Sequence, residues 1–391
     1  MKEPRDAWVV VWAAFVSVAV IFGIAYSFAA FFAPFEQEFG VQRADVSLVF
    51  GLCGLIYFLL GAPAGMLADR LGPRKVCVTG MVFIAGGLLA TSFATSIAAV
   101  YAAYGIGIGV GVGLVYAPAM ASVSPWFTRR RGLAAGIASA GIGAGTVVVP
   151  LLATSTIDAF DWRAALRVLA AGVLVVGVAG ASLLRRAPLP PAAAVPPGAT
   201  LREALRSAPF WWFYLAAVVS GPVMFIPFAH VSAAARDLGV ADASAVGLVG
   251  LIGAGSVFGR FAIGSLADRM GRIPAIVAMQ ASMGLSFLLW GSAGGYAALA
   301  VFALWFGLSY GAVVSLMPAI CMDMFGARAV SGILGTLYTG AAFGNLLGPY
   351  AAGWVFDRHG SYQPVIWACV ALAAVATAAC ARLLSRRAPA Y

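Results

Sequence analysis

The stretch Gly65-Met-Leu-Ala-Asp-Arg-Leu-Gly72 occurs twice in this chain of 391 residues, and its second copy reads Gly264-Ser-Leu-Ala-Asp-Arg-Met-Gly271. The two copies start 199 residues apart, which is close to half of the chain. Other pairs recur in the same order at nearly the same offset, namely Pro118 with Pro318, Pro150 with Pro349 and Asp158 with Asp357. Several features at one offset indicate that the chain is built from two similar halves.

The composition excludes a water-soluble protein. Apolar residues make up 62% of the chain and charged residues 10%, whereas soluble proteins carry roughly 45–50% and about 25%. This excludes a soluble globule, a disordered chain and a nucleic-acid-binding protein with a basic surface. A membrane β-barrel would alternate apolar and polar residues, and runs such as 8–33 and 165–184 show no alternation. The chain is therefore predicted to be an all-α integral membrane protein.

The apolar runs predict twelve membrane helices, since each crossing needs about 20 apolar residues. The first run is longer than the apolar region of a signal peptide, so it is interpreted as a membrane helix. The five cysteines are scattered without paired spacing, which argues against disulfides and metal sites. The predicted spans are 8–33, 44–68, 76–95, 97–124, 132–157, 165–184, 210–233, 244–267, 274–292, 296–322, 330–356 and 363–384.

The distribution of basic residues predicts the orientation of the helices. Of 24 basic residues, eighteen lie on one side of the predicted spans and five on the other. Because loops rich in Lys and Arg stay in the cytoplasm, both termini are predicted to be cytoplasmic. The five residues on the opposite side are Arg43, Arg163, Arg167, Arg236 and Arg358. The formal net charge of +10 thus reflects topology and requires no acidic partner.

The longest internal loop, 185–209, divides the chain into a six-helix bundle at 1–184 and a second one at 210–391. The five prolines in its first part, 188–197, predict an extended connector. Thr200 stands three residues before Glu203, which is the spacing of a capping box and predicts a short helix through Ser207. We therefore expect two bundles joined by a cytoplasmic linker.

The duplicated motif and the duplicated halves resemble the major facilitator superfamily over essentially the whole chain. Within that superfamily, Trp126-Phe-Thr-Arg-Arg-Arg-Gly-Leu-Ala-Ala-Gly-Ile-Ala-Ser-Ala-Gly141 resembles the fifth-helix motif of the monocarboxylate transporter family, which includes bacterial oxalate–formate exchangers. The first-helix motif of that family has a faint counterpart in Asp6-Ala-Trp8. The resemblance implies a major facilitator fold of twelve membrane helices, with the substrate site between the halves.

Arg260 is the one basic residue left inside a predicted span once those in loops and at span ends are assigned to the two sides, and it lies about 10 Å from the cytoplasmic end of its helix at roughly 1.5 Å per residue. A central arginine costs roughly 2.5–3.5 kcal/mol on insertion scales, and none of the 14 acidic residues lies mid-span. A substrate carboxylate is therefore predicted to supply the counter-ion. Alternatively, Arg260 extends to the cytoplasm or bonds backbone carbonyls. The resemblance supports the first interpretation, because the family's eighth-helix arginine before Gly-x-Leu-Ala binds the substrate carboxylate.

The chain departs from the family at three places. Animal lactate carriers have a lysine in the first helix, where this chain has Ala29 and Ala30, and an aspartate four residues before the arginine, where it has Ser256. The oxalate exchanger has a second cation in its eleventh helix, whereas 331–356 contains no Lys or Arg. One fixed positive charge favours a monocarboxylate over a dicarboxylate, and the missing carboxylate argues against a proton relay through one.

Further residues are predicted to bind substrate or to act as a gate. His230 is the only histidine in a span and titrates near neutral pH, so it is predicted to bind substrate or carry a proton; the alternative is a hydrogen-bonded histidine near the outer mouth. The repeated loops resemble the superfamily's cytoplasmic gate, with simple anchoring as the alternative. The predicted substrate-binding residues are Arg260, His230, Tyr26, Tyr116, Tyr310, Tyr338 and Asn345, and the predicted gating residues are Asp69, Arg70, Asp268 and Arg269.

These features predict a secondary active transporter of a small monocarboxylate such as lactate or pyruvate, working by alternating access with proton symport or anion exchange. The alternatives are transport of another small solute and a non-transporting sensor on the same fold. No catalytic residue, metal or cofactor is predicted, so an enzyme is not expected. The predicted partners are a small organic anion, a co-transported proton in the symport case, and membrane lipid, without nucleic acid. The chain is expected to be a monomer in a bacterial inner membrane.

Overall fold

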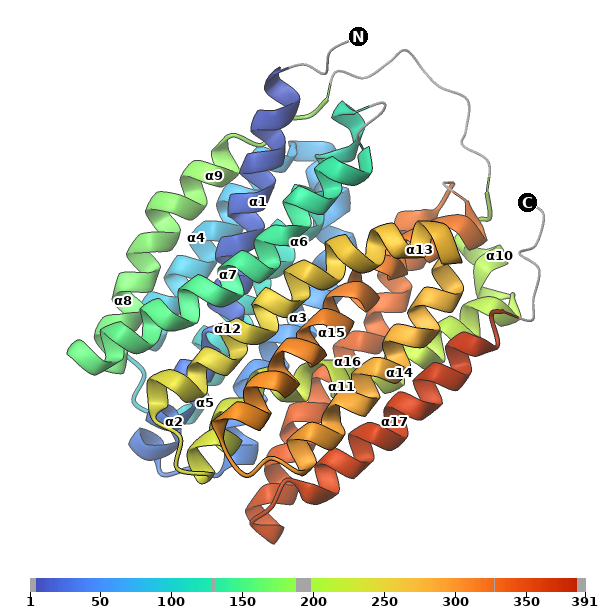
Figure 1. Ribbon diagram of the computed structural model, residues 1–391. Helices are drawn as coiled ribbons and strands as arrows, with labels where there is room; N and C mark the ends of the chain where they lie inside the picture. The colour runs from blue at the N-terminus through green and yellow to red at the C-terminus, as the bar shows by residue number, and fades with distance from the viewer. Residues whose placement is uncertain (1–4, 128–130, 188–197, 327, 385–391) are drawn as a thin grey trace.

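The computed structural model describes residues 5–127, 131–187, 198–326 and 328–384, which are almost entirely helical (Figure 1). In these ranges the only β-type pairing is an isolated antiparallel bridge between Gly198 and Gly326. The α-helices are α1 (Arg5–Tyr26), α2 (Phe28–Phe39), α3 (Arg43–Leu71), α4 (Pro73–Thr91), α5 (Ile97–Val100), α6 (Gly109–Ala121), α7 (Arg131–Ala159), α8 (Trp162–Gly172), α9 (Val178–Ser182), α10 (Leu201–Leu205), α11 (Ala208–Asp237), α12 (Asp242–Phe258), α13 (Gly264–Met270), α14 (Arg272–Gly291), α15 (Tyr296–Phe325), α16 (Val330–His359) and α17 (Gln363–Ala381). Four short segments differ: η1 (Tyr101–Ile108), η3 (Val173–Gly177) and η4 (Gly259–Ile263) are π-helical, and η2 (Ser124–Trp126) is a 3-10 turn.

Eleven helical segments of the described residues are long and apolar enough to cross a membrane. Each overlaps one of the predicted spans. The remaining predicted span, 330–356, corresponds to α16, which has 30 residues but is not among the eleven. The eleven segments are Asp6–Phe39, Arg43–Leu71, Pro73–Thr91, Ile97–Trp126, Leu133–Ala159, Trp162–Ser182, Ala208–Asp237, Asp242–Ile263, Arg272–Gly291, Tyr296–Phe325 and Gln363–Ala381.

The helices pack as two bundles that lie side by side, coloured blue to green and yellow to red in Figure 1. In the first bundle α1 packs on α7, and α3 and α4 pack on α6. In the second bundle α11 packs on α16 and α17, and α15 packs on α12 and α14. The bundles meet mainly along two helix pairs, α3 with α16 and α7 with α12. Helix α1 begins and α17 ends at the same end of the molecule (Figure 1).

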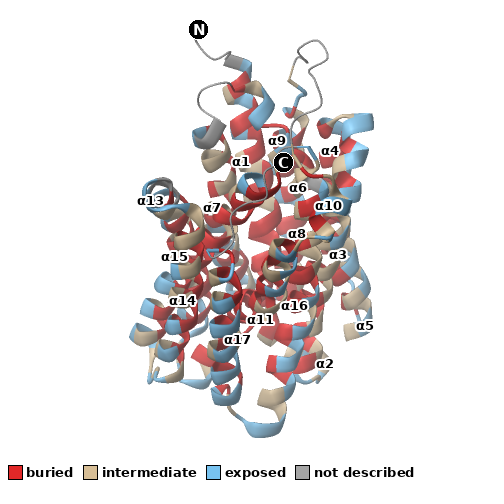
Figure 2. Ribbon diagram, turned by 90° about the vertical axis from the view of Figure 1, so that its right-hand side faces the viewer, coloured by how far each residue is buried: buried red, intermediate tan, exposed pale blue. Residues whose placement is uncertain are grey.

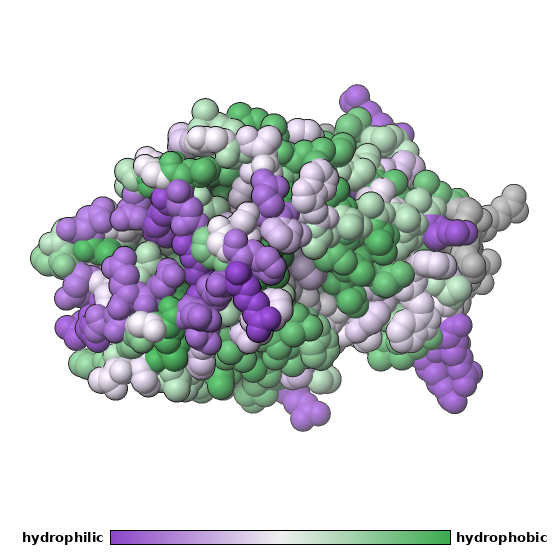
Figure 3. All heavy atoms as spheres, turned by 90° about the horizontal axis from the view of Figure 1, so that it is seen from below, coloured by the Kyte–Doolittle hydropathy of each residue, from purple (hydrophilic) through white to green (hydrophobic). Residues whose placement is uncertain are grey.

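The outer faces of the helices carry large apolar side chains. Leu152, Val175 and Phe258 are 46%, 71% and 68% exposed, respectively. Figure 2 shows that buried residues follow the faces that helices turn toward each other, with exposed residues on the outside. In Figure 3, hydrophobic side chains cover much of the visible surface and hydrophilic ones gather in separate areas. Such a surface is unfavourable in water and suits contact with lipid.

The predicted capping box forms at the end of the linker, and the helix that it opens, α10, ends at Leu205, two residues before the predicted end at Ser207. The backbone N–H of Thr200 donates to Oε2 of Glu203 at 2.7 Å, and the N–H of Glu203 donates to Oγ1 of Thr200 at 3.3 Å. These hydrogen bonds hold the pKa of Glu203 below its ordinary value. The N–H of Ala199 donates to the carbonyl of Phe325 at 2.7 Å, which ties this segment to the second bundle. The predicted extended connector at 188–197 lies outside the described residues.

Glycines let the helices approach closely where the structure requires it. A Cβ at Gly145 of α7 would lie 1.9 Å from the carbonyl oxygen of Ala19 in α1. Between the bundles, a Cβ at Gly143 would lie 2.6 Å from the carbonyl oxygen of Gly253. A backbone atom yields only if the whole helix moves, so these positions require glycine, as is common where membrane helices cross.

We expect Gly145→Ala to destabilise the protein by about 1–3 kcal/mol, the usual cost of overpacking, because the new methyl would separate α1 from α7. Thermal unfolding in detergent measures the effect. Gly172→Ala is the matched control, since a Cβ at Gly172 meets nothing within 4 Å and alanine favours the helix. Equal melting temperatures for the two variants would contradict this prediction.

Candidate functional site

A cavity lies between the two bundles, near the middle of the helices. The first bundle contributes side chains from α1, α3, α6 and α7, and the second contributes side chains from α11, α14, α15 and α16. The wall is largely apolar and aromatic, which is typical of small-molecule sites. Its lining residues are Phe22, Tyr26, Tyr57, Phe58, Tyr116, Ile142, Phe213, Ala216, Ala217, Ser220, Met224, Phe225, Ile276, Gln280, Tyr310, Val313, Val314, Met317, Tyr338 and Ala341.

Tyrosines supply most of the polar atoms in this wall. Tyr26 and Tyr310 face each other from opposite bundles, and their hydroxyl oxygens are 3.0 Å apart. The Tyr26 ring also stacks on Phe228 of the second bundle, with centroids 4.1 Å apart and planes at 13°. Tyr116 and Tyr338 line the same cavity from α6 and α16. The structure therefore brings together all four predicted tyrosines.

Arg260 lies beside this cavity in the π-helical segment η4. Its side chain is buried, Nε donates to Oγ of Ser256 at 3.3 Å, and the buried Nη2 has no hydrogen-bond partner among the described residues. The guanidinium charge interacts electrostatically with four of the five tyrosines that line the cavity. No ion pair of Arg260 with a described residue is found. Ser256 stands where animal lactate carriers have an aspartate. It therefore accepts a hydrogen bond from Arg260 but supplies no negative charge to balance the guanidinium.

The close packing of η4 explains why Arg260 is held there. A Cβ at Gly259 would lie 2.0 Å from the carbonyl oxygen of Leu308 in α15. Gly255, one turn earlier, meets Leu304 of the same helix in the same way, at 2.4 Å. The glycines press this face of the helix against α15, so the adjacent Arg260 is confined within the protein. Extension to the cytoplasm, the alternative interpretation, does not fit a side chain that is 6% exposed.

Asn345 is buried, but it does not line the cavity. Its amide lies in the contact between α16 and α3, where a Cβ on Gly54 would come within 1.2 Å of Nδ2. Both amide atoms are buried without a partner among the described residues. Asn345 is thus a polar group at the interface between the bundles, and its predicted role in substrate binding stays a prediction.

A second polar site lies at the end of the bundles opposite α1's start, where α3 begins. We call Glu36, Arg43, Asp237, Asp357 and Tyr362 the Arg43 cluster. Arg43 of the first bundle donates two hydrogen bonds to the carboxylate of Asp237 in the second, both 2.7 Å long. It also donates to the hydroxyl of Tyr362 at 3.0 Å, and its guanidinium stands 3.6 Å from Glu36.

Asp357 joins the bundles through the backbone. Its carboxylate accepts the N–H groups of Arg43 at 3.2 Å and of Ala44 at 3.0 Å, so it satisfies the first turn of α3 from the other bundle. Helix N-termini leave such N–H groups without partners and attract negative charge. A Cβ at Gly353 would lie 2.6 Å from the N atom of Ala44, which shows how closely α16 approaches α3 here. The Arg43 cluster therefore ties the two bundles together at this end of the molecule.

His230 belongs with the Arg43 cluster and not with the cavity. Its Nε2 lies 2.8 Å from the carbonyl oxygen of Pro349, which only accepts, so Nε2 carries the proton. Its Nδ1 then accepts from the hydroxyl of Tyr362 at 2.9 Å, and Oγ of Ser47 in the first bundle is 3.0 Å from Nε2. His230 is thus fully hydrogen-bonded within the protein, and its predicted role in substrate binding or proton transfer stays a prediction.

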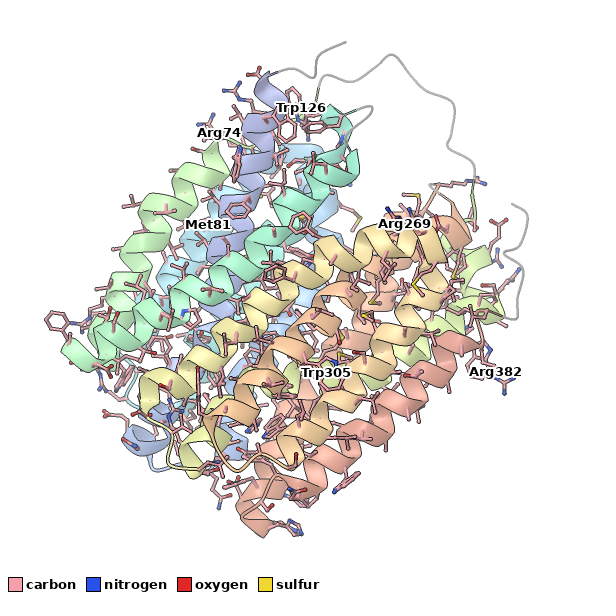
Figure 4. All side chains as sticks on the ribbon, in the orientation of Figure 1. Arg74, Met81, Trp126, Arg269, Trp305 and Arg382 are labelled. Atoms are coloured by element: carbon pink, nitrogen blue, oxygen red, sulfur yellow. The ribbon has the colours of Figure 1, made fainter. Side chains whose placement is uncertain are left out.

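The predicted gating residues lie at the opposite end. Arg70 and Arg269 are exposed, and Arg269 is well separated from Arg74 of the first bundle in Figure 4. Arg186 donates to the backbone carbonyls of Ala68 and Asp69. The side chain of Asp268 is outside the described part of the chain. Among described residues, the ion pair between the bundles is Arg43 with Asp237, so no such pair closes the end that carries the repeated motifs.

Two groups of residues were not predicted from the sequence. Gln280 of α14 lines the cavity and donates from Nε2 to Oγ of Ser220 at 2.8 Å. Gln280 could have been singled out from the sequence, because an amide side chain in the middle of an apolar span is costly without a partner. The Arg43 cluster was missed because Arg43, Asp237 and Asp357 are far apart in sequence and each resembles an ordinary charge at the membrane surface.

Two helical bundles around a central cavity with few polar groups define the architecture of a secondary transporter. Comparison with known proteins also identifies the chain as a transporter. The family model of the Major Facilitator Superfamily matches residues 13–338 and 224–391, so the chain belongs to this superfamily. It is therefore a multi-pass membrane transporter and not an enzyme.

The chain is also similar to individual proteins. Monocarboxylate transporter 13 of Rattus norvegicus is 32% identical over 367 residues, covering 92% of this chain and 85% of that protein. Monocarboxylate transporter 4 of Gallus gallus is 27% identical over 382 residues, covering 93% and 80%. A crystal structure of a bacterial homologue of the human lysosomal transporter Spinster, in an inward-facing and unoccupied conformation, has a TM-score of 0.74 at 16% identity and covers 100% of both chains. The resemblance to monocarboxylate transporters is thus confirmed.

Breaking the Arg43 cluster should part the bundles at that end. Ser232 is fully buried and its Oγ lies 3.5 Å from the carbonyl of Ala29 in the other bundle, so its exposure reports on separation. In a cysteine-free background carrying Ser232→Cys, we expect Asp237→Asn to speed maleimide labelling in detergent several-fold.

The control for this experiment is Asp323→Asn. It removes a carboxylate that pairs with Arg272 at 2.8 Å inside the second bundle, so the labelling rate should stay unchanged. Equal rates in the Asp237 variant and its parent would show that the ion pair does not hold the bundles together.

Proposed function

We propose that the chain is a secondary active transporter of small monocarboxylates that works by alternating access. The observation that carries the proposal is the buried guanidinium of Arg260, which has no ionic partner among the described residues and stands beside a tyrosine-lined cavity. A carboxylate would supply the missing charge and accept two hydrogen bonds from the guanidinium. The names of the relatives, monocarboxylate transporters 13 and 4, support this substrate class.

The rest of the cavity favours a single carboxylate. The lining contains no charged residue, and 331–356 of α16 contains no Lys or Arg. A second carboxylate would therefore be buried without a counter-charge, which is strongly unfavourable. The tyrosine hydroxyls and the aromatic rings suit a small anion with an apolar body.

We further propose twelve membrane helices, with α16 as the twelfth and both termini in the cytoplasm, on the basis of the basic-residue distribution. The Arg43 cluster then faces the outside and holds the outer end closed. On this orientation the structure corresponds to an inward-facing state, the state in which the Spinster homologue was crystallised. Asp69, Arg70, Asp268 and Arg269 would close the inner end in the opposite state. Location in a bacterial inner membrane stays a prediction.

Arg260→Gln should reduce the uptake of labelled lactate or pyruvate into proteoliposomes by at least about tenfold. The reason is that the substitution removes the charged, bidentate hydrogen bonding of the guanidinium to the carboxylate. The matched control is Arg167→Gln, since Arg167 bonds Oγ of Ser92 away from the cavity. Undiminished uptake by the Arg260 variant would overturn the assignment of Arg260 as the carboxylate ligand.

Transport should be electroneutral, because both proton symport and exchange of one anion for another move no net charge. We expect a potassium diffusion potential of either sign to leave the uptake rate unchanged in wild-type proteoliposomes. Stimulation by an inward proton gradient would then identify symport, and stimulation only by internal unlabelled anion would identify exchange. A rate that follows the membrane potential would contradict both modes.

A further inference from the structure

Gln280 is a buried polar side chain that the carboxylate site does not use. It is 3% exposed, lies in α14 and forms part of the cavity wall. Its Nε2 donates to Oγ of Ser220 in α11 at 2.8 Å, which fixes the orientation of the amide. Its Oε1 is buried and has no hydrogen-bond partner among the described residues.

An unpartnered buried carbonyl oxygen is costly, and native proteins leave few of them. Two buried atoms of the described residues lack a hydrogen-bond partner beside the cavity. One is a donor, Nη2 of Arg260, and the other is an acceptor, Oε1 of Gln280. A ligand that satisfies both must carry an anionic acceptor and, apart from it, a hydrogen-bond donor. The lining has no acidic residue to pair with an ammonium group, so a neutral hydroxyl is the donor that fits.

We infer that Gln280 is a specificity-determining residue whose Oε1 accepts a hydrogen bond from a hydroxyl group of the substrate, so that the preferred substrates are hydroxy-monocarboxylates. The inference rests on the proposed function, since Arg260 is taken to hold the carboxylate. Ser220 acts as a positioning residue, because its hydrogen bond keeps Nε2 occupied and leaves Oε1 as the amide atom without a partner among the described residues.

The test compares three matched pairs of acids: glycolate with acetate, lactate with propionate, and 3-hydroxybutyrate with butyrate. Inhibition constants are measured against uptake of labelled propionate, which lacks the hydroxyl and is therefore insensitive to the proposed contact. In the wild type we expect at least one hydroxy acid to inhibit about 2- to 12-fold more tightly than its partner, the range of one net hydrogen bond. The pair with the largest ratio of inhibition constants shows which spacing between hydroxyl and carboxylate the site prefers in its substrate.

Gln280→Met keeps the length of the side chain and removes the acceptor, so the ratio should fall to about 1 while inhibition by the deoxy acids is retained. Gln363→Met is the matched control, because Gln363 bonds the carbonyl of Gly291 at an exposed position, and it should keep the wild-type ratio. If Gln280→Met does not fold, Ser220→Ala provides the same test, since it frees the amide to rotate and should lower the ratio.

Three results would overturn the inference: ratios near 1 for all pairs in the wild type, a ratio that survives Gln280→Met, or equal weakening of both members of every pair, which would indicate a packing role. Failure of the proposed function gives a different result. In that case wild-type proteoliposomes would show no saturable uptake of labelled propionate, lactate or pyruvate, and none of the six acids would compete.

Discussion

Inside a membrane every polar atom must find its partner within the protein, because the lipid core offers no water. The chain obeys this constraint closely: the hydroxyls of Thr91, Thr146 and Thr154 all donate back to carbonyls of the preceding turn. Few buried side-chain atoms of the described residues lack a partner, and they belong to Ser17, Arg236, Arg260, Gln280 and Asn345. Two of these side chains, Arg260 and Gln280, stand at the cavity, so the constraint itself points to where a ligand would be bound.

The cavity and the Arg43 cluster lie along the same interface between the two bundles. Tyr26 contacts Tyr310 and Phe228 across the two bundles at the cavity, and further along the same interface Arg43 and His230 tie α3 to the second bundle. A movement that parts α3 from α16 at the Arg43 cluster would therefore also separate the aromatic groups that cover one side of the cavity. Under the proposed alternating access, opening the cavity and breaking the Arg43 cluster would be parts of one rearrangement, the rigid-body rocking of the two halves.

The fold was largely predictable from the sequence, because membrane spans are encoded in local runs of apolar residues and the repeat is visible in the motif at 65–72 and 264–271. The burial of Arg260 was predictable for a similar reason, since it is the one basic residue that lies well inside those runs and not near their ends. The environment of His230 was not, because its partners Ser47, Pro349 and Tyr362 come from helices more than a hundred residues away, and only tertiary packing brings them together. The unpaired Oε1 of Gln280 likewise depends on where Ser220 lies.

Although the halves are duplicated, the two interfaces between the bundles are built from different contacts. Asp357 caps α3, but its repeat mate Asp158 is exposed, and the position equivalent to Arg43 in the second half is Asp242, which pairs with Arg236 of its own bundle. At the α7–α12 interface the close contact is made by Gly143 and Gly253 instead, with no ion pair between the bundles among the described residues. A smooth glycine contact lets helices slide or pivot, whereas an ion pair with a helix cap must be broken. In the proposed alternating access the α7–α12 pair would therefore serve as the pivot and the α3–α16 pair as the contact that opens, although the two pairs are formed by repeat-related helices.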